Sequence, residues 1–119
     1  MKALELGYPR TDLRRELVAL VLAGAKTTTA GLGEEEEDGE RAPGERLALL
    51  GWDGEPVGTV EVVEHRIVPA AEIDERFARD EGEGFETVDD WRVAHEEFFG
   101  GPIEPDTPIS ALRFRLVQA

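Results

Sequence analysis

Two short segments of the chain contain the residue types that could do chemistry. The first is Lys26 followed by Thr27 to Thr29, and Lys26 is one of two lysines, while the other eleven basic residues are arginines. A lysine can give up its proton when it is desolvated, so it can act as a general base or activate a neighbouring hydroxyl as a nucleophile. Lys26 could equally be a surface lysine that interacts with the carboxyl end of a preceding helix.

The second segment, Glu81-Gly82-Glu83-Gly84, places two carboxylates two residues apart with glycines between them. Glycine permits a tight turn and the close approach of another backbone or a ligand. One carboxylate could orient Lys26 and hold it as a cation, and the other could bind a hydroxyl or an amine. In a chain this acidic, the same segment could also be a simple helix-terminating turn.

Trp91 and His95 are further candidates, four residues apart on one face of an expected helix. Trp91 could offer a stacking surface if it faces a cleft, although its place on the apolar face favours core packing. A histidine beside an aromatic residue is more often structural, and we interpret His65, in the middle of a predicted strand, in the same way. Two histidines and no cysteine argue against a zinc site, and we expect neither a metal nor a cofactor.

A helix and a strand are predicted to position Lys26. Thr11 or Asp12 can cap the helix, which ends at Gly24, where a left-handed backbone is needed. Its apolar positions repeat at helical spacing: Leu13, Leu17, Leu20 and Val21. Residues 26–30 are predicted to form a strand that leaves this corner, with Thr27 and Thr29 on one side.

The middle of the chain is predicted to be a loop followed by a hairpin. The acidic run Glu34 to Asp38 has no apolar face, so we expect a mobile, solvated loop. Residues 46–52 and 56–68 are predicted as strands joined by a turn at Asp53-Gly54. Valines occur on both faces of the second strand, which predicts that both faces are partly covered.

Two helices and a strand are predicted in the C-terminal half. Pro69 is expected to open a helix that contains Ile73 and Phe77. Residues 87–90 match a capping box, so a second helix should start there and end at Gly100-Gly101. The apolar residues of this second helix fall on one face: Val88, Trp91, His95 and Phe98. Residues 110–117 alternate, with apolar side chains on one side and Arg113 and Arg115 on the other.

Composition sets the class of protein. A chain of 119 residues is predicted to form a single domain, 1–119, and short strands interrupted by two or three helices indicate an α+β fold with a curved or barrel-like sheet. The absence of cysteine, of a signal peptide and of a membrane-length apolar run leads us to expect a cytoplasmic protein with no membrane partner. The net charge of −14 argues against tight binding of long duplex nucleic acid, which is a polyanion.

Four segments in this order resemble the ASCH domain family of the PUA-like superfamily. They are residues 17–30 around Gly24-Ala25-Lys26-Thr27-Thr28-Thr29, residues 77–84 ending in Glu81-Gly82-Glu83-Gly84, residues 91–99 from Trp91-Arg92 to Phe98-Phe99, and Asp106-Thr107 before residues 114–117. The resemblance implies a PUA-like β-barrel of about five or six strands with two or three flanking helices, and a role close to RNA or nucleosides.

The resemblance also implies a catalytic set. Some small bacterial members resemble amidohydrolases that remove an acetyl group from the exocyclic amine of cytidine, and their lysine, threonine and glutamate match Lys26, Thr29 and Glu81. Thr27, Glu83, Trp91, Arg92 and His95 would then bind the substrate. The chain departs from the family pattern at Gly31, where an arginine is usual, and this weakens the case for a polyanionic substrate.

The sequence therefore supports three functional hypotheses. The favoured one is an amidohydrolase that acts on an acylated cytidine-type nucleoside, with Lys26 as base, Thr29 as nucleophile and Glu81 orienting Lys26 or protonating the leaving amine. The first alternative is a non-catalytic module that binds short RNA or a modified nucleoside. The second is a ribonuclease that needs no metal. All three hypotheses require Lys26, Thr29 and Glu81 to meet at one cleft, and the sequence leaves the oligomeric state open.

Overall fold

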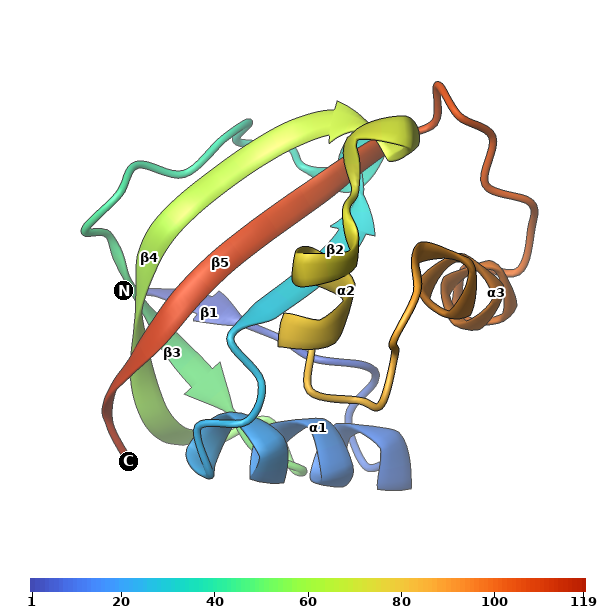
Figure 1. Ribbon diagram of the computed structural model, residues 1–119. Coiled ribbons are helices and arrows are strands. Elements are labelled where there is room, and N and C mark those ends of the chain that lie inside the picture. The colour runs from blue at the N-terminus through green and yellow to red at the C-terminus, as the bar shows by residue number, and fades with distance from the viewer.

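The computed structural model describes residues 1–119 as one mixed five-stranded sheet with three α-helices (Figure 1). The strands are neighbours in the order β1 (Lys2–Leu4), β3 (Arg46–Leu50), β4 (Pro56–Pro69), β5 (Pro108–Gln118) and β2 (Thr28–Leu32). Strands β1 and β3 are parallel, and all other pairs are antiparallel. The sheet curves strongly but stays open, because β1 and β2 form its two edges and do not pair with each other. The predicted α+β, barrel-like fold is confirmed.

The helices are α1 (Asp12–Leu22), α2 (Glu75–Asp80) and α3 (Val88–Phe99), and two single 3-10 turns are η1 (Gly33–Glu35) and η2 (Ala70–Glu72). Helix α1 lies across one end of the curved sheet, while α2 and α3 lie beside β2 (Figure 1). None of these helices combines the length and the apolar composition that a membrane span requires.

The predicted caps of α1 and α3 are confirmed. The Thr11 side chain accepts a hydrogen bond from the Arg14 backbone, and the chain turns after the helix at Gly24, whose φ is +79°. Thr87 and Asp90 form the reciprocal capping box of α3, and Gly100 ends this helix in the left-handed conformation. Local side-chain chemistry therefore determines where both helices begin and end.

The predicted hairpin is confirmed: it is formed by β3 and β4, which pair antiparallel. Strands β4 and β5 form the long centre of the sheet. They pair from Thr59 opposite Gln118 to Pro69 opposite Pro108, with register shifts after Thr59 and after Val62. Such bulges bend a strand and increase its twist, which accounts for the strong curvature of this sheet.

Three expectations need correction. Val57 and Val63 are 40% and 45% exposed, so the face of β4 that carries them is open to solvent at these positions. Ile73 is not on a helix, because Pro69 is followed by the short turn η2 and α2 starts only at Glu75, capped by Asp74. The sequence interpretation also missed β1, whose three residues are too few to show an alternating pattern.

Two apolar clusters form the core. The first packs α1 against the concave face of the sheet, and it contains Leu4, Leu6, Leu17, Val18, Val21, Leu47, Leu49, Val60, Val62, Leu112 and Phe114. The second holds η2, α2 and α3 near β2, and it contains Val68, Ala70, Ile73, Ala78, Trp91, Ile103 and Ile109. Helix α3 is thus anchored through Trp91, which is 1% exposed.

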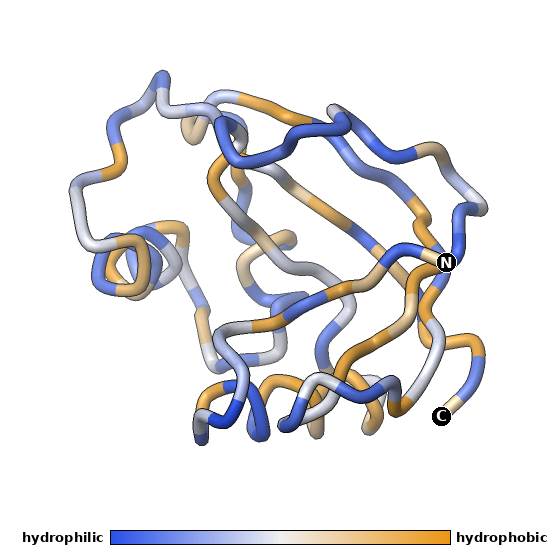
Figure 2. The backbone as a smooth tube through the Cα atoms, turned by 180° about the vertical axis from the view of Figure 1, so that it is seen from behind, coloured by the Kyte–Doolittle hydropathy of each residue, from blue (hydrophilic) through white to orange (hydrophobic).

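The acidic segment between β2 and β3 runs over the surface of the molecule and is mostly hydrophilic in Figure 2. Glu36 accepts a hydrogen bond from Ser110 on β5 at 2.9 Å, and Glu40 accepts one from the Ile67 backbone at 2.7 Å. His65 accepts a hydrogen bond from the Arg41 backbone through Nδ1, at 2.7 Å, and bonds Ser110 through Nε2. Because Nδ1 accepts, Nε2 carries the proton, so His65 supports the sheet and is not a base for Ser110.

Candidate functional site

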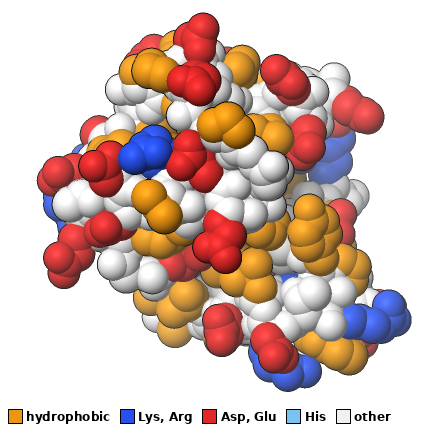
Figure 3. Space-filling view, turned by 90° about the vertical axis from the view of Figure 1, so that its right-hand side faces the viewer, with side chains coloured by type: hydrophobic (Ala, Val, Ile, Leu, Met, Phe, Trp, Pro, Cys, Tyr) orange, Lys and Arg blue, Asp and Glu red, His pale blue; other side chains and the backbone are white.

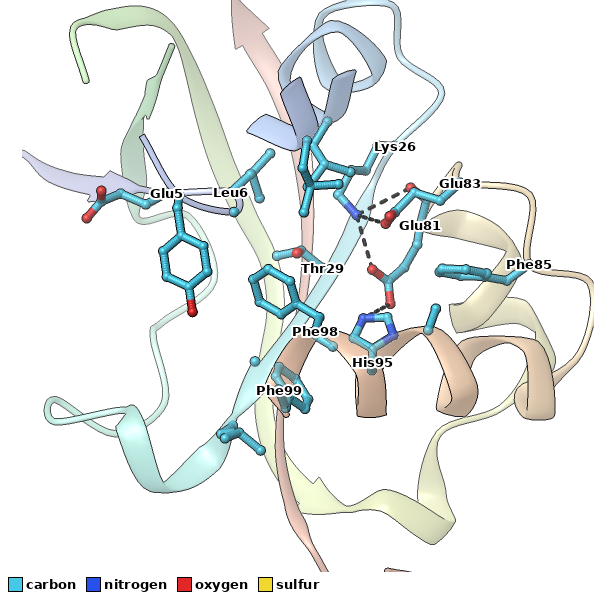
Figure 4. Close-up of a pocket in the computed structure, with 18 of the residues that line it drawn as sticks. Glu5, Leu6, Lys26, Thr29, Glu81, Glu83, Phe85, His95, Phe98 and Phe99 are labelled. Atoms are coloured by element: carbon cyan, nitrogen blue, oxygen red, sulfur yellow. Dashed lines mark hydrogen bonds and ion pairs between the residues drawn. The ribbon is translucent and has the colours of Figure 1, made fainter. Parts of the chain in front are cut away.

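A cavity of about 410 Å³ lies at the open side of the sheet, between the segment that follows β1 and the edge strand β2. It is lined by five segments of the chain: residues 5–8, α1, residues 26–35, the turn between α2 and α3, and the second half of α3. Figure 4 shows Lys26, Thr29, Glu81, Glu83 and His95 gathered around it.

A close crossing of two segments brings Lys26 to Glu81. The Thr27 backbone donates a hydrogen bond to the carbonyl of Asp80 at 2.9 Å, which ties the start of β2 to the end of α2. Gly82 has a φ of +73°, and a Cβ at this position would lie 2.4 Å from the carbonyl oxygen of Ala25. Only glycine allows the two segments to approach this closely, which explains why a glycine stands between Glu81 and Glu83.

The Lys26 side chain is 1% exposed and ends between two carboxylates. Its Nζ lies 3.1 Å from Glu81 Oε1, 2.8 Å from Glu83 Oε2 and 3.3 Å from the Glu81 carbonyl oxygen. An ammonium group has three N–H donors, and three acceptors surround this one. The resting geometry is that of a buried, fully bonded lysine cation.

Glu81 has donors on both oxygens of its carboxylate. Oε1 accepts from Lys26, while Oε2 accepts from the Trp91 indole Nε1 at 2.5 Å and lies 3.3 Å from His95 Nε2. Burial acts to raise the pKa of Glu81, but the hydrogen bond from His95 and the charge of Lys26 outweigh it, so the pKa lies below its usual value. Glu81 is therefore a buried carboxylate anion.

The contacts of His95 assign its protons. Nδ1 lies 2.8 Å from the carbonyl oxygen of Trp91, which can only accept, so Nδ1 carries a proton. Nε2 faces a carboxylate oxygen of Glu81 and bonds it only when it is protonated as well. Burial acts to lower the pKa of His95, but the hydrogen bond and charge of Glu81 raise it overall. Two cations and two carboxylates thus form one cluster: Lys26, His95, Glu81 and Glu83.

Glu83 is the carboxylate of this cluster that remains open to the cavity. Its side chain is 22% exposed, against 1% for Glu81. Burial and the neighbouring charge of Glu81 raise the pKa of Glu83, and the opposing attraction of Lys26 does not cancel this.

The Thr29 side chain faces the cavity, as Figure 4 shows, and its hydroxyl forms no hydrogen bond within the protein. Neighbouring residues of a strand point to opposite sides, and Thr28 accordingly turns away and donates to the Phe77 carbonyl oxygen at 2.9 Å. Thr29 therefore presents a free hydroxyl in the cavity that Lys26 also lines.

Aromatic side chains that sequence reasoning did not assign to the site form its walls. Tyr8 and Phe98 stack at a centroid distance of 5.5 Å, and Phe85 and Phe99 lie edge-on to the His95 ring. Tyr8 and Phe98 are 63% and 40% exposed. The one available signal was the apolar pair Phe98-Phe99 at the end of a helix that needed only one apolar face.

Three of the predicted substrate-binding residues do not line the cavity. Thr27 donates to the Asp80 carbonyl oxygen, and Trp91 lies in the core behind Glu81. Arg92 pairs with Glu96 at 3.0 Å and Asp89 at 3.4 Å on the outer side of α3. The other two, Glu83 and His95, line the cavity together with Lys26, Thr29 and Glu81.

The cavity is acidic overall. Glu5 and Glu35 add two carboxylates to those of Glu81 and Glu83, and Lys26 and His95 are the basic residues of the lining. Gly31 also lines it, and a Cβ there would meet open space, so the cavity has room at this position. No group of three or more histidine or carboxylate side chains is arranged to hold a metal ion.

Comparison with known proteins agrees with this architecture. The ASCH domain from Lactobacillus crispatus JV V101 has a TM-score of 0.80 and 22% identity, over 99% of this chain and 80% of that one. Protein EF3133 from Enterococcus faecalis V583 has a TM-score of 0.82 and 23% identity, over 99% and 77%. Hypothetical protein PH0355 has a TM-score of 0.66 and 20% identity, over 88% and 94%.

A search of curated protein sequences gave no significant match. The structural neighbours establish the fold, while the family assignment comes from the sequence. A model of the ASCH domain matches residues 6–118, a range that includes every residue lining the cavity except Glu5. The chain belongs to the ASCH domain family.

Proposed function

We propose that this protein hydrolyses the amide bond of an acylated, cytidine-type nucleoside in the cavity. The observation that carries the proposal is that one cavity is lined by three groups from two distant segments: the Lys26 ammonium and the free Thr29 hydroxyl from one, and the Glu81 carboxylate from the other. Acyl transfer needs a nucleophile, a basic group and a residue that orients the base, and groups of all three kinds line this cavity.

In this proposal Thr29 Oγ1 attacks the acyl carbon, and Lys26 receives the hydroxyl proton once it has released one of its own. Glu81 keeps the lysine side chain in place, which is the first of the two roles that sequence reasoning allowed it. The proton that Lys26 released goes to the leaving amine as the C–N bond breaks, and water then hydrolyses the acyl-threonine ester. The products are a free acid and an unmodified exocyclic amine.

Size and charge favour a small, uncharged substrate. A cavity of about 410 Å³ is within the range of small-molecule sites, and its phenylalanine and tyrosine walls can stack on a flat base. Four carboxylates line it, and acidic side chains are spread over the face shown in Figure 3 with fewer basic ones between them. A phosphate group would be repelled, so a nucleoside fits better than a nucleotide or long RNA.

The test is to incubate the protein with N4-acetylcytidine and to measure the release of cytidine and acetate. We expect Thr29→Val to lower kcat by about 1,000-fold because it removes the nucleophile, while Thr29→Ser retains activity. Lys26→Ala is the second inactive control. Equal turnover by the wild type and both inactive variants would rule out the proposed site.

A binding module without chemistry is the second candidate. The observation in its favour is that all three N–H groups of Lys26 are already bonded, as in an ion cluster that only supports the fold. This candidate predicts saturable binding of modified nucleosides or short RNA with no product. Shortened RNA formed without added metal would instead indicate a ribonuclease.

A further inference from the structure

We propose that Glu83 is the residue that exchanges protons with the substrate, and that Glu81 is a positioning residue that holds Lys26. This assignment rests on the proposed amide hydrolysis, and it divides between two carboxylates the roles that the sequence hypothesis gave to Glu81 alone. It follows from which oxygen atoms are free.

Glu81 has no oxygen available for a substrate. One oxygen accepts from Lys26, the other accepts from Trp91 and faces His95, and the side chain is 1% exposed. Protonating a leaving amine would require Glu81 to leave the charged His95 ring and the Trp91 indole, which is buried in the second apolar cluster. Its contacts therefore suit a fixed anion that orients the Lys26 ammonium.

Glu83 differs from Glu81 in its contacts and in its access to the cavity. Its Oε2 lies 2.8 Å from Lys26 Nζ, its other oxygen accepts no hydrogen bond within the protein, and the side chain lines the cavity with 22% of its surface exposed. Glu83 can thus touch Lys26 and a bound ligand at the same time. Its raised pKa agrees with a carboxylate that takes up a proton readily.

The proton balance of the step closes with these two residues. The Lys26 ammonium passes one proton to the Glu83 carboxylate, which leaves a neutral amine and a carboxylic acid. The amine then takes the Thr29 hydroxyl proton as Oγ1 bonds to the acyl carbon. When the C–N bond breaks, the Glu83 carboxylic acid gives its proton to the leaving amine. Lys26 is again an ammonium and Glu83 a carboxylate, and hydrolysis of the ester by water repeats the exchange.

The first experiment compares Glu83→Gln, Glu83→Asp and Glu81→Gln on N4-acetylcytidine across pH. Because the ionised Glu83 must accept a proton, wild-type activity should fall as pH drops through the raised pKa of Glu83. We expect Glu83→Gln to lower kcat by about 100-fold with little change in KM and to lose this acid limb. Glu83→Asp should keep the limb and recover part of the rate.

We expect the main effect of Glu81→Gln to be a loss of stability of the folded protein. We expect a larger fall in Tm for Glu81→Gln than for Glu83→Gln, and any folded Glu81→Gln protein should keep the acid limb. If Glu83→Gln retains the wild-type rate and pH profile, the assignment is wrong. It is equally wrong if Glu81→Gln folds as well as the wild type and is the variant that loses the acid limb.

A measurement without substrate separates this proposal from the proposed function. Carbon-13 NMR of labelled glutamate carboxyl groups, assigned with the Gln variants, follows both residues through a pH titration. Glu83 should titrate above its usual range and Glu81 below it, with the Lys26 Nζ signal changing in step with Glu83. Titration of Glu83 in the normal range would overturn the assignment, whereas absent turnover with the expected titration would refute the hydrolysis alone.

Discussion

The buried charges around Lys26 are the central chemical feature of this protein. Each charged atom of Lys26, Glu81 and His95 faces a partner of opposite charge or a backbone carbonyl. Removing one member of such a cluster leaves an uncompensated buried charge, which is strongly destabilising. Substitutions here will therefore change stability as well as activity, and both need to be measured.

The two histidines should respond to pH with opposite signs. The folded-state pKa of His95 is raised, so its stabilising contribution is present below the usual value of about 6.5 and is lost as pH rises through the folded pKa. Burial lowers the pKa of His65, so the contribution of His65 is present above about 6.5 and is lost as pH falls toward the folded pKa.

Urea unfolding of His95→Gln and His65→Gln at several pH values tests this difference. We expect the loss of unfolding free energy caused by His95→Gln to shrink from about pH 5.5 to about pH 9.5, and the loss caused by His65→Gln to grow. Each variant serves as the control for the other. Parallel pH profiles for the two losses would contradict the proton assignments of these rings.

Two connections between elements position the site. The corner from α1 into β2 carries Lys26 and Thr29, and the turn from α2 into α3 carries Glu81 and Glu83. A third connection, from β1 to α1, is held by the buried Arg14, which donates to the backbone carbonyls of Leu6, Gly7 and Gly51. Tyr8 lies on that connection, so Arg14 supports one wall of the cavity.

Gly82 and Gly84 form a matched pair for testing the contact between the first two connections. Both have positive φ, +73° and +93°, but a Cβ would strike the Ala25 carbonyl only at Gly82 and would meet open space at Gly84. We expect Gly84→Ala to cost about 1 kcal/mol of unfolding free energy from backbone strain. Gly82→Ala should cost about 3 kcal/mol, because strain and a backbone clash add.

Activity should follow the same order, since Gly82→Ala pushes the two segments apart and separates Lys26 from Glu81. Chemical denaturation and N4-acetylcytidine turnover would be measured on both variants. Equal stability losses at the two positions would show that the Gly82 contact does not hold the site together.

The molecule as a whole carries a large excess of negative charge on an open, curved sheet. The cavity lies between the edge strand β2 and the segment that follows β1, the other edge strand. The net charge of −14 comes from 27 acidic and 13 basic residues, and several exposed acids have no basic partner. Self-repulsion of this kind destabilises the folded state and is screened by salt.

We therefore expect Tm to rise when NaCl is raised from about 50 mM to about 500 mM, because the Debye length shortens and repulsion weakens. Glu34 and Glu37 are exposed and form no ion pair, so replacing both with glutamine should raise Tm at low salt and reduce the salt response. Differential scanning calorimetry at matched pH measures both effects. A Tm that falls with salt would mean that attractive ion pairs dominate this surface.

Local sequence patterns were sufficient to predict most elements. Thr11, Gly24, the capping box at Thr87 and the Asp53-Gly54 turn act on their immediate neighbours, so their effect is visible in a few consecutive residues. The same logic failed for Ile73 and for β1. The turn after Pro69 and the three-residue strand β1 are held in place by hydrogen bonds to distant segments. A short stretch of sequence does not include these partners, so it cannot predict either element.

The site divides in the same way. The residue types and their order in the chain were enough to predict Lys26, Thr29 and Glu81 as candidate site residues, because both can be read from the sequence. Packing decides that the Glu81 carboxylate is buried while the Glu83 carboxylate is exposed to the cavity. Packing also decides that Arg92 and Thr27 do not line the cavity. Burial, hydrogen-bond partners and access to a cavity depend on side chains that meet only after the chain has folded, so they could be known only from the three-dimensional arrangement.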